Sequence, residues 1–271
     1  MRAIRAEFVK LLTTKLWWIL LIVLLAYVAF TAGIVGLAFS GSLPEPGGSP
    51  DPSAPQIPAE VLPPIIYSVA HSIGYVFPLL LGTLAVTGEF RHQTLTPTFL
   101  ATPKRGRVLA AKLVVMAIFG ALYGVVALIG AVGTGAAVLS INGTTGLDDS
   151  DHWLMFARIV LAMALWAIIG VGVGALIPNQ VAAIVVVLAF TQFIEPILRT
   201  IAGIVDWVAD VGNYLPGAAG DTLAGASIFT ALAGPGADPA LEWWHGGLLL
   251  LAYALVATIV GYLVSWRRDV T

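Results

Sequence analysis

Residues 16–40 read LWWILLIVLLAYVAFTAGIVGLAFS and contain no charged side chain. An α-helix rises about 1.5 Å per residue, so it needs roughly 20 apolar residues to cross a hydrocarbon core of about 30 Å. The run also exceeds the apolar region of a signal peptide, usually about 7–15 residues, and no convincing small-residue cleavage site follows it. We therefore interpret residues 16–40 as a retained transmembrane helix.

Five further apolar runs are of comparable length, and they cover residues 65–87, 113–141, 159–177, 181–198 and 246–266. Only 10% of the 271 residues are charged and 59% are hydrophobic, whereas a soluble domain has about 25% charged residues. A surface with so few charges must largely face lipid. The sequence therefore predicts an all-α, polytopic membrane protein with six transmembrane helices in a single domain over residues 1–271.

The positive charges are distributed unequally between the two sides of this arrangement. Of the 13 lysine and arginine residues, all except Arg158 and Arg199 fall on the side of both termini if there are six spans. Most acidic residues lie in or beside the opposite loops. Because cytoplasmic segments are enriched in lysine and arginine, we predict that both termini are cytoplasmic.

Two outer segments differ in character. Residues 41–64 are rich in proline and glycine, which predicts an extended linker, with a lid or partner-binding strap as the alternative. Residues 199–244 form a longer segment. Apolar residues recur at helical spacing over 201–211, which predicts an amphipathic helix that lies at the interface or re-enters the protein. A second short helix is predicted over 221–232. Three tryptophans are placed as in an interfacial belt: Trp207, Trp243 and Trp244.

The N-terminal arm, residues 1–15, places Ile4, Phe8 and Leu11 on one helical face. Four basic residues surround this stripe: Arg2, Arg5, Lys10 and Lys15. The composition is typical of an amphipathic helix in the inner headgroup region. A generic positive anchor for the first span is the alternative interpretation.

The segment between the second and third spans, residues 88–112, reads GEFRHQTLTPTFLATPKRGRVLAAK. Its order of residues resembles permeases of the drug, polysaccharide and sodium exporter branch of ABC transporters. The matching positions are Glu89, Arg91, Thr94, Leu95, Pro103, Arg105, Arg107 and Lys112. Gln93 stands where many members of that family have glycine. The resemblance extends over nearly the whole chain and includes Tyr214-Leu-Pro216 before the sixth span, although each motif is loose by itself.

The resemblance implies a function. In that family this loop forms a cytoplasmic coupling helix that docks on a separate ATPase subunit, which binds ATP and Mg²⁺. The residues expected to face the ATPase are Glu89, Arg91, Pro103, Lys104, Arg105 and Arg107. The resemblance also implies an exporter that works with a second copy or a paralogous permease, in the plasma membrane of a bacterial cell. A merely solvated basic loop is the alternative.

The chain itself offers no enzymatic site to sequence reasoning. It has no Gly-x-x-x-x-Gly-Lys-Ser/Thr loop, no His-Glu-x-x-His or Gly-x-Ser-x-Gly motif, no cysteine and no histidines at metal-ligand spacing. We therefore expect no catalytic residue, metal or cofactor in this chain, and no nucleic-acid partner. Gly120 and Gly124, like Gly170 and Gly174, have the Gly-x-x-x-Gly spacing that lets helices approach closely, within the bundle or at a dimer seam.

Few ionisable residues lie within the predicted spans. Glu195 is near the outer end of the fifth span, with Gln192 and Arg199 about one turn away on either side. An interfacial Glu195–Arg199 ion pair is the simpler interpretation, and an outer gate formed by these three residues is the alternative. His71 is the only histidine within a span; we expect a packed imidazole rather than a proton relay, because its own span has no acidic partner.

Two other functions stay open. The chain could be a membrane anchor or sensor subunit that transports nothing. It could also be a secondary transporter driven by an ion gradient, although the small number of intramembrane carboxylates argues against ion coupling.

Overall fold

The computed structural model describes residues 2–40, 59–143, 145–202, 205, 208, 211–229 and 241–266. All regular elements in these ranges are helices, and six segments are long and apolar enough to cross a membrane. The six segments are Leu16–Phe39, Leu62–Arg91, Arg105–Leu139, Ser150–Leu176, Gln180–Ala202 and Trp243–Trp266. The prediction of an all-α membrane protein with six transmembrane helices is confirmed. Residues 41–64 are predicted to form an extended linker or a lid; residues 41–58 lie outside the described residues, whereas residues 59–64 are helical and belong to η1 and the start of α3.

The helices follow one another along the chain with few long breaks. They are α1 (Arg2–Leu12), α2 (Leu16–Ser40), η1 (Ala59–Val61), α3 (Leu62–Ser72), α4 (Val76–Arg91), α5 (Leu95–Ala101), α6 (Arg105–Leu139), η2 (Ser140–Asn142), α7 (Ser150–Leu176), α8 (Gln180–Ala189), η3 (Phe190–Ile194), α9 (Glu195–Ala202), α11 (Pro216–Ala224), α13 (Trp243–Gly261) and η4 (Tyr262–Trp266). The helices extend beyond most of the predicted apolar runs, because charged residues flank those runs without ending the helix.

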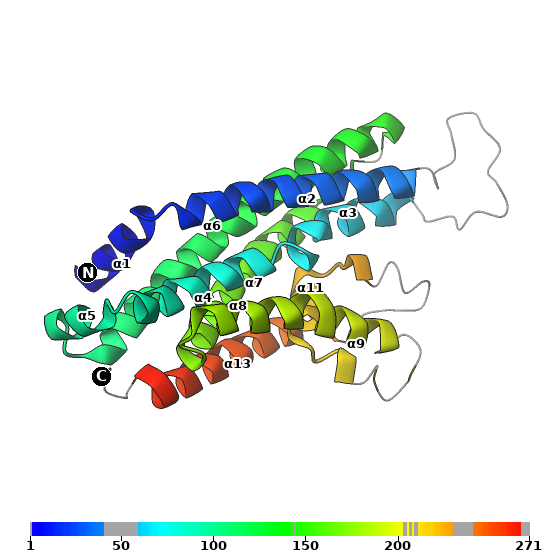
Figure 1. Cartoon of the computed structure of the whole chain (residues 1–271). Coiled ribbons are helices and arrows are strands. Elements are labelled where there is room, and N and C mark those ends of the chain that lie inside the picture. The colour runs from blue at the N-terminus through cyan, green and yellow to red at the C-terminus, as the bar shows by residue number, and fades with distance from the viewer. Residues whose placement is uncertain are drawn as a thin grey trace.

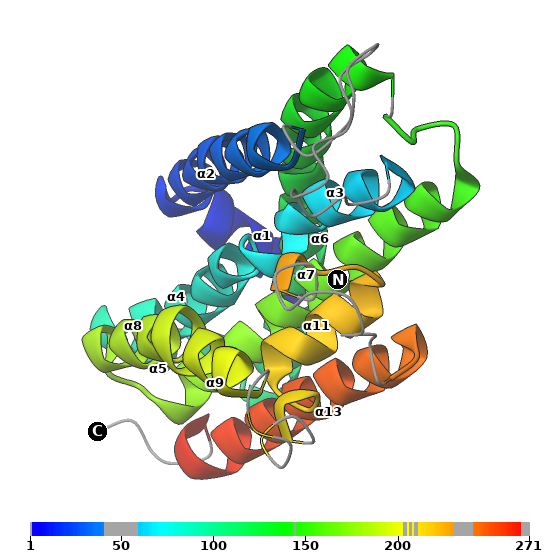
Figure 2. The ribbon, with the colours of Figure 1, turned by 90° about the vertical axis from the view of Figure 1, so that its right-hand side faces the viewer.

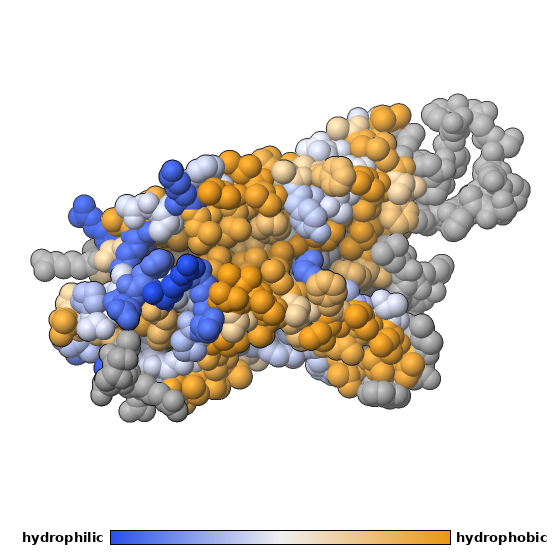
Figure 3. All heavy atoms as spheres, in the orientation of Figure 1, coloured by the Kyte–Doolittle hydropathy of each residue, from blue (hydrophilic) through white to orange (hydrophobic). Residues whose placement is uncertain are grey.

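The two ends of the bundle differ in polarity. The short helices α1 and α5 lie at the same end of the elongated bundle (Figure 1). Hydrophilic residues gather at this end, while hydrophobic residues cover most of the middle of the same face (Figure 3). We call this end the basic end, because the lysine and arginine residues of α1 and of the start of α6 lie there. The other end, where α9 and α11 lie, is called the opposite end.

The second span is broken into two helices, α3 and α4, at Ile73–Tyr75. Pro78 has no N–H to donate to the carbonyl of Gly74, and its ring disfavours a continuous helix there. At Gly74 a Cβ atom would overlap the carbonyl oxygen of Ala70. The backbone at the break therefore has room for glycine but not for a residue with a side chain. Gly74 and Pro78 together explain why the helix is interrupted here.

The fifth span is also irregular. Its middle turn, η3, is a π-helix between α8 and α9, where the predicted span 181–198 was continuous. Pro196 cannot donate to the carbonyl of Gln192, four residues earlier, and the N–H of Glu195 instead bonds to Phe190, five residues earlier. Wide turns of this kind occur often at functional sites.

The helix α7 lies in the middle of the bundle and packs closely on α4, α6 and α13 (Figure 2). Glycines make these contacts possible. A Cβ atom at Gly120 would lie 2.6 Å from the carbonyl oxygen of Met163, and one at Gly174 would lie 2.6 Å from that of Thr83. At Gly170 it would overlap the carbonyl oxygen of Leu79. Both Gly-x-x-x-Gly pairs are therefore used within the bundle.

Part of the segment 199–244 packs inside the bundle. The helix α11 packs against α13, α7 and α3. It begins at Pro216, a residue suited to the first turn, and it ends before Gly225, whose φ of 89° is left-handed. A helix is predicted over 221–232; the observed helix α11 covers Pro216–Ala224, so it begins and ends earlier than predicted. The predicted amphipathic stretch 201–211 is described only in part, and Trp207 lies outside the described residues.

Candidate functional site

Four charged side chains form a compact cluster at the basic end. The basic-end cluster consists of Glu7, Lys10, Glu89 and Lys112. Lys112 Nζ lies 2.5 Å from Glu7 Oε2 and 3.2 Å from Glu89 Oε1. Lys10 Nζ lies 2.8 Å from Glu7 Oε1 and 2.8 Å from Glu89 Oε1. Two lysines and two glutamates thus balance each other in charge.

The basic-end cluster joins four helices. Glu7 and Lys10 belong to α1, Glu89 to α4 and Lys112 to α6. Lys10 also donates to the hydroxyl of Thr98 in α5, at 3.3 Å. Glu7, Glu89 and Lys112 are only 4%, 7% and 2% exposed. Charges buried to this degree require partners, so α1 is held against the bundle by these pairs.

Glu7 and Lys10 of α1 are kept in their ionised forms by the opposite charges around them. Burial by itself would raise the pKa of Glu7, but Lys112 and Lys10 outweigh it and lower that pKa below the ordinary value of 4.5. Burial likewise opposes the charge of Lys10, but Glu89 and Glu7 raise the pKa of Lys10 above 10.5. Both groups are therefore charged near neutral pH.

The residues expected to face an ATPase lie in two different environments. Glu89 is inside the basic-end cluster and away from the surface. Arg91 is exposed and donates to Gln180 at the start of the fifth span, at 3.1 Å. Pro103, Lys104 and Arg107 are also exposed.

Arg105 ties the start of α6 to the end of the sixth span. It donates to the carbonyl of Trp266 at 3.3 Å, while Trp266 Nε1 donates to the carbonyl of Arg105 at 3.2 Å. The guanidinium also lies 4.9 Å from the ring centre of Phe99 in α5. Phe99 in turn packs edge-on against Trp266, with ring centres 5.6 Å apart. The helix α5 is therefore fixed to both α6 and the sixth span.

The turn between α4 and α5 has a conformation that suits glycine, the residue that many members of the resembled family have in place of Gln93. Gln93 has a φ of 54°, a left-handed conformation that glycine adopts most easily. Thr94 N–H bonds to the carbonyl of Glu89 at 3.0 Å and Gln93 N–H to that of Phe90 at 3.2 Å. This pair of bonds is a Schellman motif, in which glycine usually occupies the position of Gln93.

The apolar stripe of the N-terminal arm faces the protein. Ile4 and Phe8 pack against the core and Leu11 is 6% exposed. The ring of Phe8 lies 5.9 Å from that of Phe119 in α6. The stripe predicted for the headgroup region therefore makes its contacts with α6.

A second polar cluster lies at the opposite end, among α3, α7, α9 and α11. The buried network, as we call it, consists of His71, Ser72, Trp166, Glu195, Arg199, Asp221 and Ser227. Asp221 is at its centre and its two oxygens interact with four groups: His71 Nδ1 at 2.9 Å, Ser72 Oγ at 2.8 Å, Arg199 Nη1 at 2.7 Å and Ser227 Oγ at 2.6 Å. A carboxylate accepts about four hydrogen bonds, so Asp221 is fully satisfied.

The partners of His71 define its tautomer. Trp166 Nε1 lies 3.2 Å from His71 Nε2. An indole nitrogen can only donate, so Nε2 accepts, and the proton resides on Nδ1, which donates to Asp221. His71 therefore has an acidic partner that its own span does not provide. Burial alone would raise the pKa of Asp221, but Arg199 and His71 lower it below the ordinary value.

Glu195 makes more contacts than the predicted ion pair. Arg199 Nη2 lies 3.3 Å from Glu195 Oε1, so the pair exists. The same oxygen accepts from the N–H groups of Gly217 at 2.6 Å and Ala218 at 3.2 Å. Glu195 thus caps the N-terminus of α11, where a negative charge is favourable. It is 1% exposed, so it is a buried carboxylate rather than an interfacial one.

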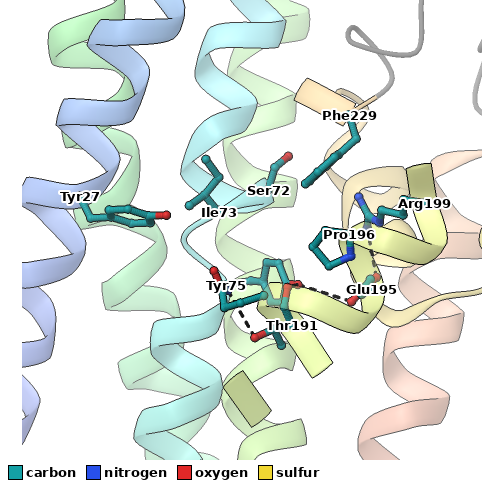
Figure 4. A pocket seen from close by; sticks show the side chains of 10 residues that line it. Tyr27, Ser72, Ile73, Tyr75, Thr191, Glu195, Pro196, Arg199 and Phe229 are labelled. Atoms are coloured by element: carbon teal, nitrogen blue, oxygen red, sulfur yellow. Dashed lines mark hydrogen bonds and ion pairs between the residues drawn. The ribbon is translucent and has the colours of Figure 1, made fainter. Parts of the chain in front are cut away.

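A cavity of about 190 Å³ lies beside the buried network, between α2, the break in the second span and α9. It is lined by Tyr27, Ser72, Ile73, Tyr75, Thr191, Gln192, Glu195, Pro196, Arg199 and Phe229. Figure 4 shows Tyr75 between the broken span and Glu195. The Tyr75 hydroxyl lies 3.4 Å from Glu195 Oε2 and 3.4 Å from the carbonyl of Thr191. The three residues of the predicted outer gate all line this cavity.

Two charged residues of these clusters escaped sequence reasoning, although each left a signal. Asp221 is the single charged residue between Val211 and Ala237, which is unusual for a solvated loop. Glu7 is the single acid in a basic arm, three residues before Lys10. Within the described residues no group of three or more histidine, aspartate or glutamate side chains could hold a metal ion.

Comparison with known proteins adds no assignment. No protein-family model matches the chain, and no curated protein matches it in sequence. The six long apolar helices define it as a multi-pass α-helical membrane protein.

Proposed function

We propose that this chain is the membrane-spanning permease subunit of an ATP-driven ABC exporter. In this proposal it pairs with a second copy or a related permease, and separate ATPase subunits bind at the basic end, on the cytoplasmic side. The resemblance of residues 88–112 to such permeases is the starting point. The observation that supports it best is the way α5 is exposed and connected.

The surface of α5 has the properties of a docking element. Leu100 is 79% exposed, and Lys104 and Arg107 follow it on the exposed side of the loop. An apolar residue bordered by positive charges suits a partner groove with an acidic rim. The resemblance implies that this partner is an ATPase.

The connections of α5 suit the transfer of movement. Lys10 links Thr98 to the basic-end cluster, and Phe99 packs on Trp266. A partner that displaces α5 would therefore act on α1, α4, α6 and the sixth span at once. Packed helices respond to such displacements by small rigid movements, which is the requirement for a permease that binds no nucleotide itself.

The proposal is tested by purifying the tagged chain from its native membranes and measuring Mg-ATP hydrolysis in the eluate. Wild-type chain should retain an ATPase, whereas Leu100→Asp, Lys104→Glu and Arg107→Glu should each reduce the retained activity. Arg5→Glu is the matched control, because Arg5 is exposed on α1 at the same end. Failure to retain an ATPase, or equal retention in all four variants, would contradict the proposal.

One observation favours a second candidate, an ion-coupled secondary transporter. Two buried carboxylates, Glu195 and Asp221, lie close to each other through Arg199, and buried ionisable groups are frequent in ion pathways. Such a transporter would move its substrate in sealed vesicles without ATP, and an ionophore would abolish the movement. An exporter of the first kind would require ATP and its partner.

A further inference from the structure

One carboxyl oxygen at the cavity beside the buried network, Glu195 Oε2, has few hydrogen-bond partners. Glu195 Oε1 has three partners, but within the part of the chain that the structure describes Oε2 has only the 3.4 Å contact with the Tyr75 hydroxyl. A carboxylate oxygen can accept about two hydrogen bonds. Because Glu195 is 1% exposed, bulk water does not supply the missing donors. Oε2 therefore faces the cavity with unused accepting capacity (Figure 4).

With Glu195 ionised, the charges around the cavity do not balance. Two carboxylates, Glu195 and Asp221, share one guanidinium, that of Arg199. The hydrogen bonds of His71 describe a neutral imidazole, so the buried network has one negative charge in excess whenever Glu195 is ionised. The N-terminus of α11 offsets about half a charge at most. An excess charge at this depth is costly, and a bound cation would remove that cost.

The walls of the cavity limit what kind of cation fits. Aromatic rings from three separate segments line it: Tyr27 of α2, Tyr75 at the break and Phe229. Ring faces attract organic ammonium groups. A metal ion would need several oxygen ligands, and Oε2 is the one carboxylate oxygen of the described lining that lacks strong donors. An anion at Arg199 would add to the negative excess.

We propose that this cavity binds a small organic cation of the alkylammonium class. Its nitrogen lies near Glu195 Oε2, and its alkyl groups contact the rings of Tyr27 and Tyr75. The binding itself does not depend on an ATPase. The inference that the cation is the transported substrate rests on the proposed exporter function.

The test uses the purified chain in a maltoside detergent, which has no ammonium group. Its unfolding temperature is measured against rising choline chloride, sodium chloride at equal ionic strength, and 3,3-dimethyl-1-butanol, the uncharged isostere of choline. Choline should raise the unfolding temperature in a saturable way, because a ligand that binds only the folded state stabilises it. Sodium chloride and the isostere should not. Equal shifts with sodium chloride would overturn the proposal.

Choline binding to variants of Glu195 and Tyr27 tests whether the cation binds in this cavity. Glu195→Gln should weaken choline binding about tenfold, the loss expected for one charge-assisted contact, while its amide oxygen still accepts from α11. Tyr27→Leu should also weaken binding, whereas Tyr27→Phe, which keeps the ring, should bind as the wild type does. Tyr27 makes no polar contact with the buried network, so its variants remain informative if Glu195→Gln does not fold. Unchanged binding in both Glu195→Gln and Tyr27→Leu would overturn the proposal.

Two further measurements distinguish a free ammonium ligand from a lipid headgroup, and the binding site from the exporter function. Lysophosphatidylcholine below its micellar concentration presents the same ammonium group on a lipid. A shift with this lipid and none with choline supports the ammonium site with a lipid as its ligand. Choline binding without a retained ATPase would support the site and contradict the exporter, whereas a retained ATPase without binding of either probe would do the reverse.

Discussion

Lys112 of α6 donates a hydrogen bond of 2.5 Å to Glu7 of α1, across 105 positions of sequence. Both side chains are almost fully buried. Lys112 is the buried positive charge of the basic-end cluster, and Lys10 is the positive charge nearer the surface. The N-terminal arm is thus part of the folded bundle.

Removal of Lys112 should be strongly destabilising. Lys112→Met leaves Glu7 and Glu89 with Lys10 as their remaining positive partner, and breaking a buried pair costs about 3–5 kcal/mol. Chemical unfolding in detergent measures this change. The double variant Lys112→Met/Glu7→Gln should lose less than the sum of the two single losses. Lys104→Met is the control, because Lys104 is exposed, and strictly additive losses would show that the pair does not act as a unit.

Acid and alkali should release α1 for opposite reasons. Because the pKa of Glu7 is lowered from 4.5 in the folded state, its contribution is complete above 4.5 and is lost as the pH falls through the lower value. Because the pKa of Lys10 is raised from 10.5, its contribution is complete below 10.5 and is lost as the pH rises through the higher value. Unfolding temperature against pH measures both losses. Lys10→Gln should lessen the alkaline loss, whereas Lys15→Gln should leave it as in the wild type.

A methyl group at Gly220 should disturb the buried network. A Cβ atom there would overlap the imidazole of His71 and lie 3.1 Å from Trp166 Nε1. Overpacking of this kind costs about 1–3 kcal/mol, so Gly220→Ala should unfold more easily than the wild type. Gly133→Ala is the matched control, since nothing lies within 4 Å of its added Cβ. That variant should be slightly more stable, by about 0.5–1 kcal/mol, because alanine is the better helix former.

Glycine should be tolerated or preferred at position 93. The left-handed conformation of Gln93 costs a residue with a side chain about 1–2 kcal/mol, and glycine avoids that cost while losing more chain entropy on folding. Gln93→Gly should therefore raise stability by up to about 1 kcal/mol. His92→Gly, at a φ of −94°, should lower it. A clear loss in Gln93→Gly would mean that the glutamine side chain itself has a role.

The six spans could be predicted because hydrophobicity and length alone define them. The run 16–40 needs no tertiary information to be recognised, and the glycine pairs predicted close packing correctly. The Glu195–Arg199 pair followed from spacing on one helix. The partners of Asp221 and Glu7 come from helices distant in sequence, so no local pattern indicates them. The depth of α11 depends in the same way on the space that Gly217, Gly220 and Gly246 leave for their neighbours.

The break at Ile73–Tyr75 divides one transmembrane segment between two packing partners. The first half, α3, packs mainly on α6 and α2, whereas the second half, α4, packs mainly on α7 and α8. Any sliding of one helix group past the other must be absorbed at the three residues around Gly74. Those residues adjoin His71 and include two of the cavity walls, Ile73 and Tyr75, so a displacement of α4 relative to α3 would change the shape of the cavity beside Glu195.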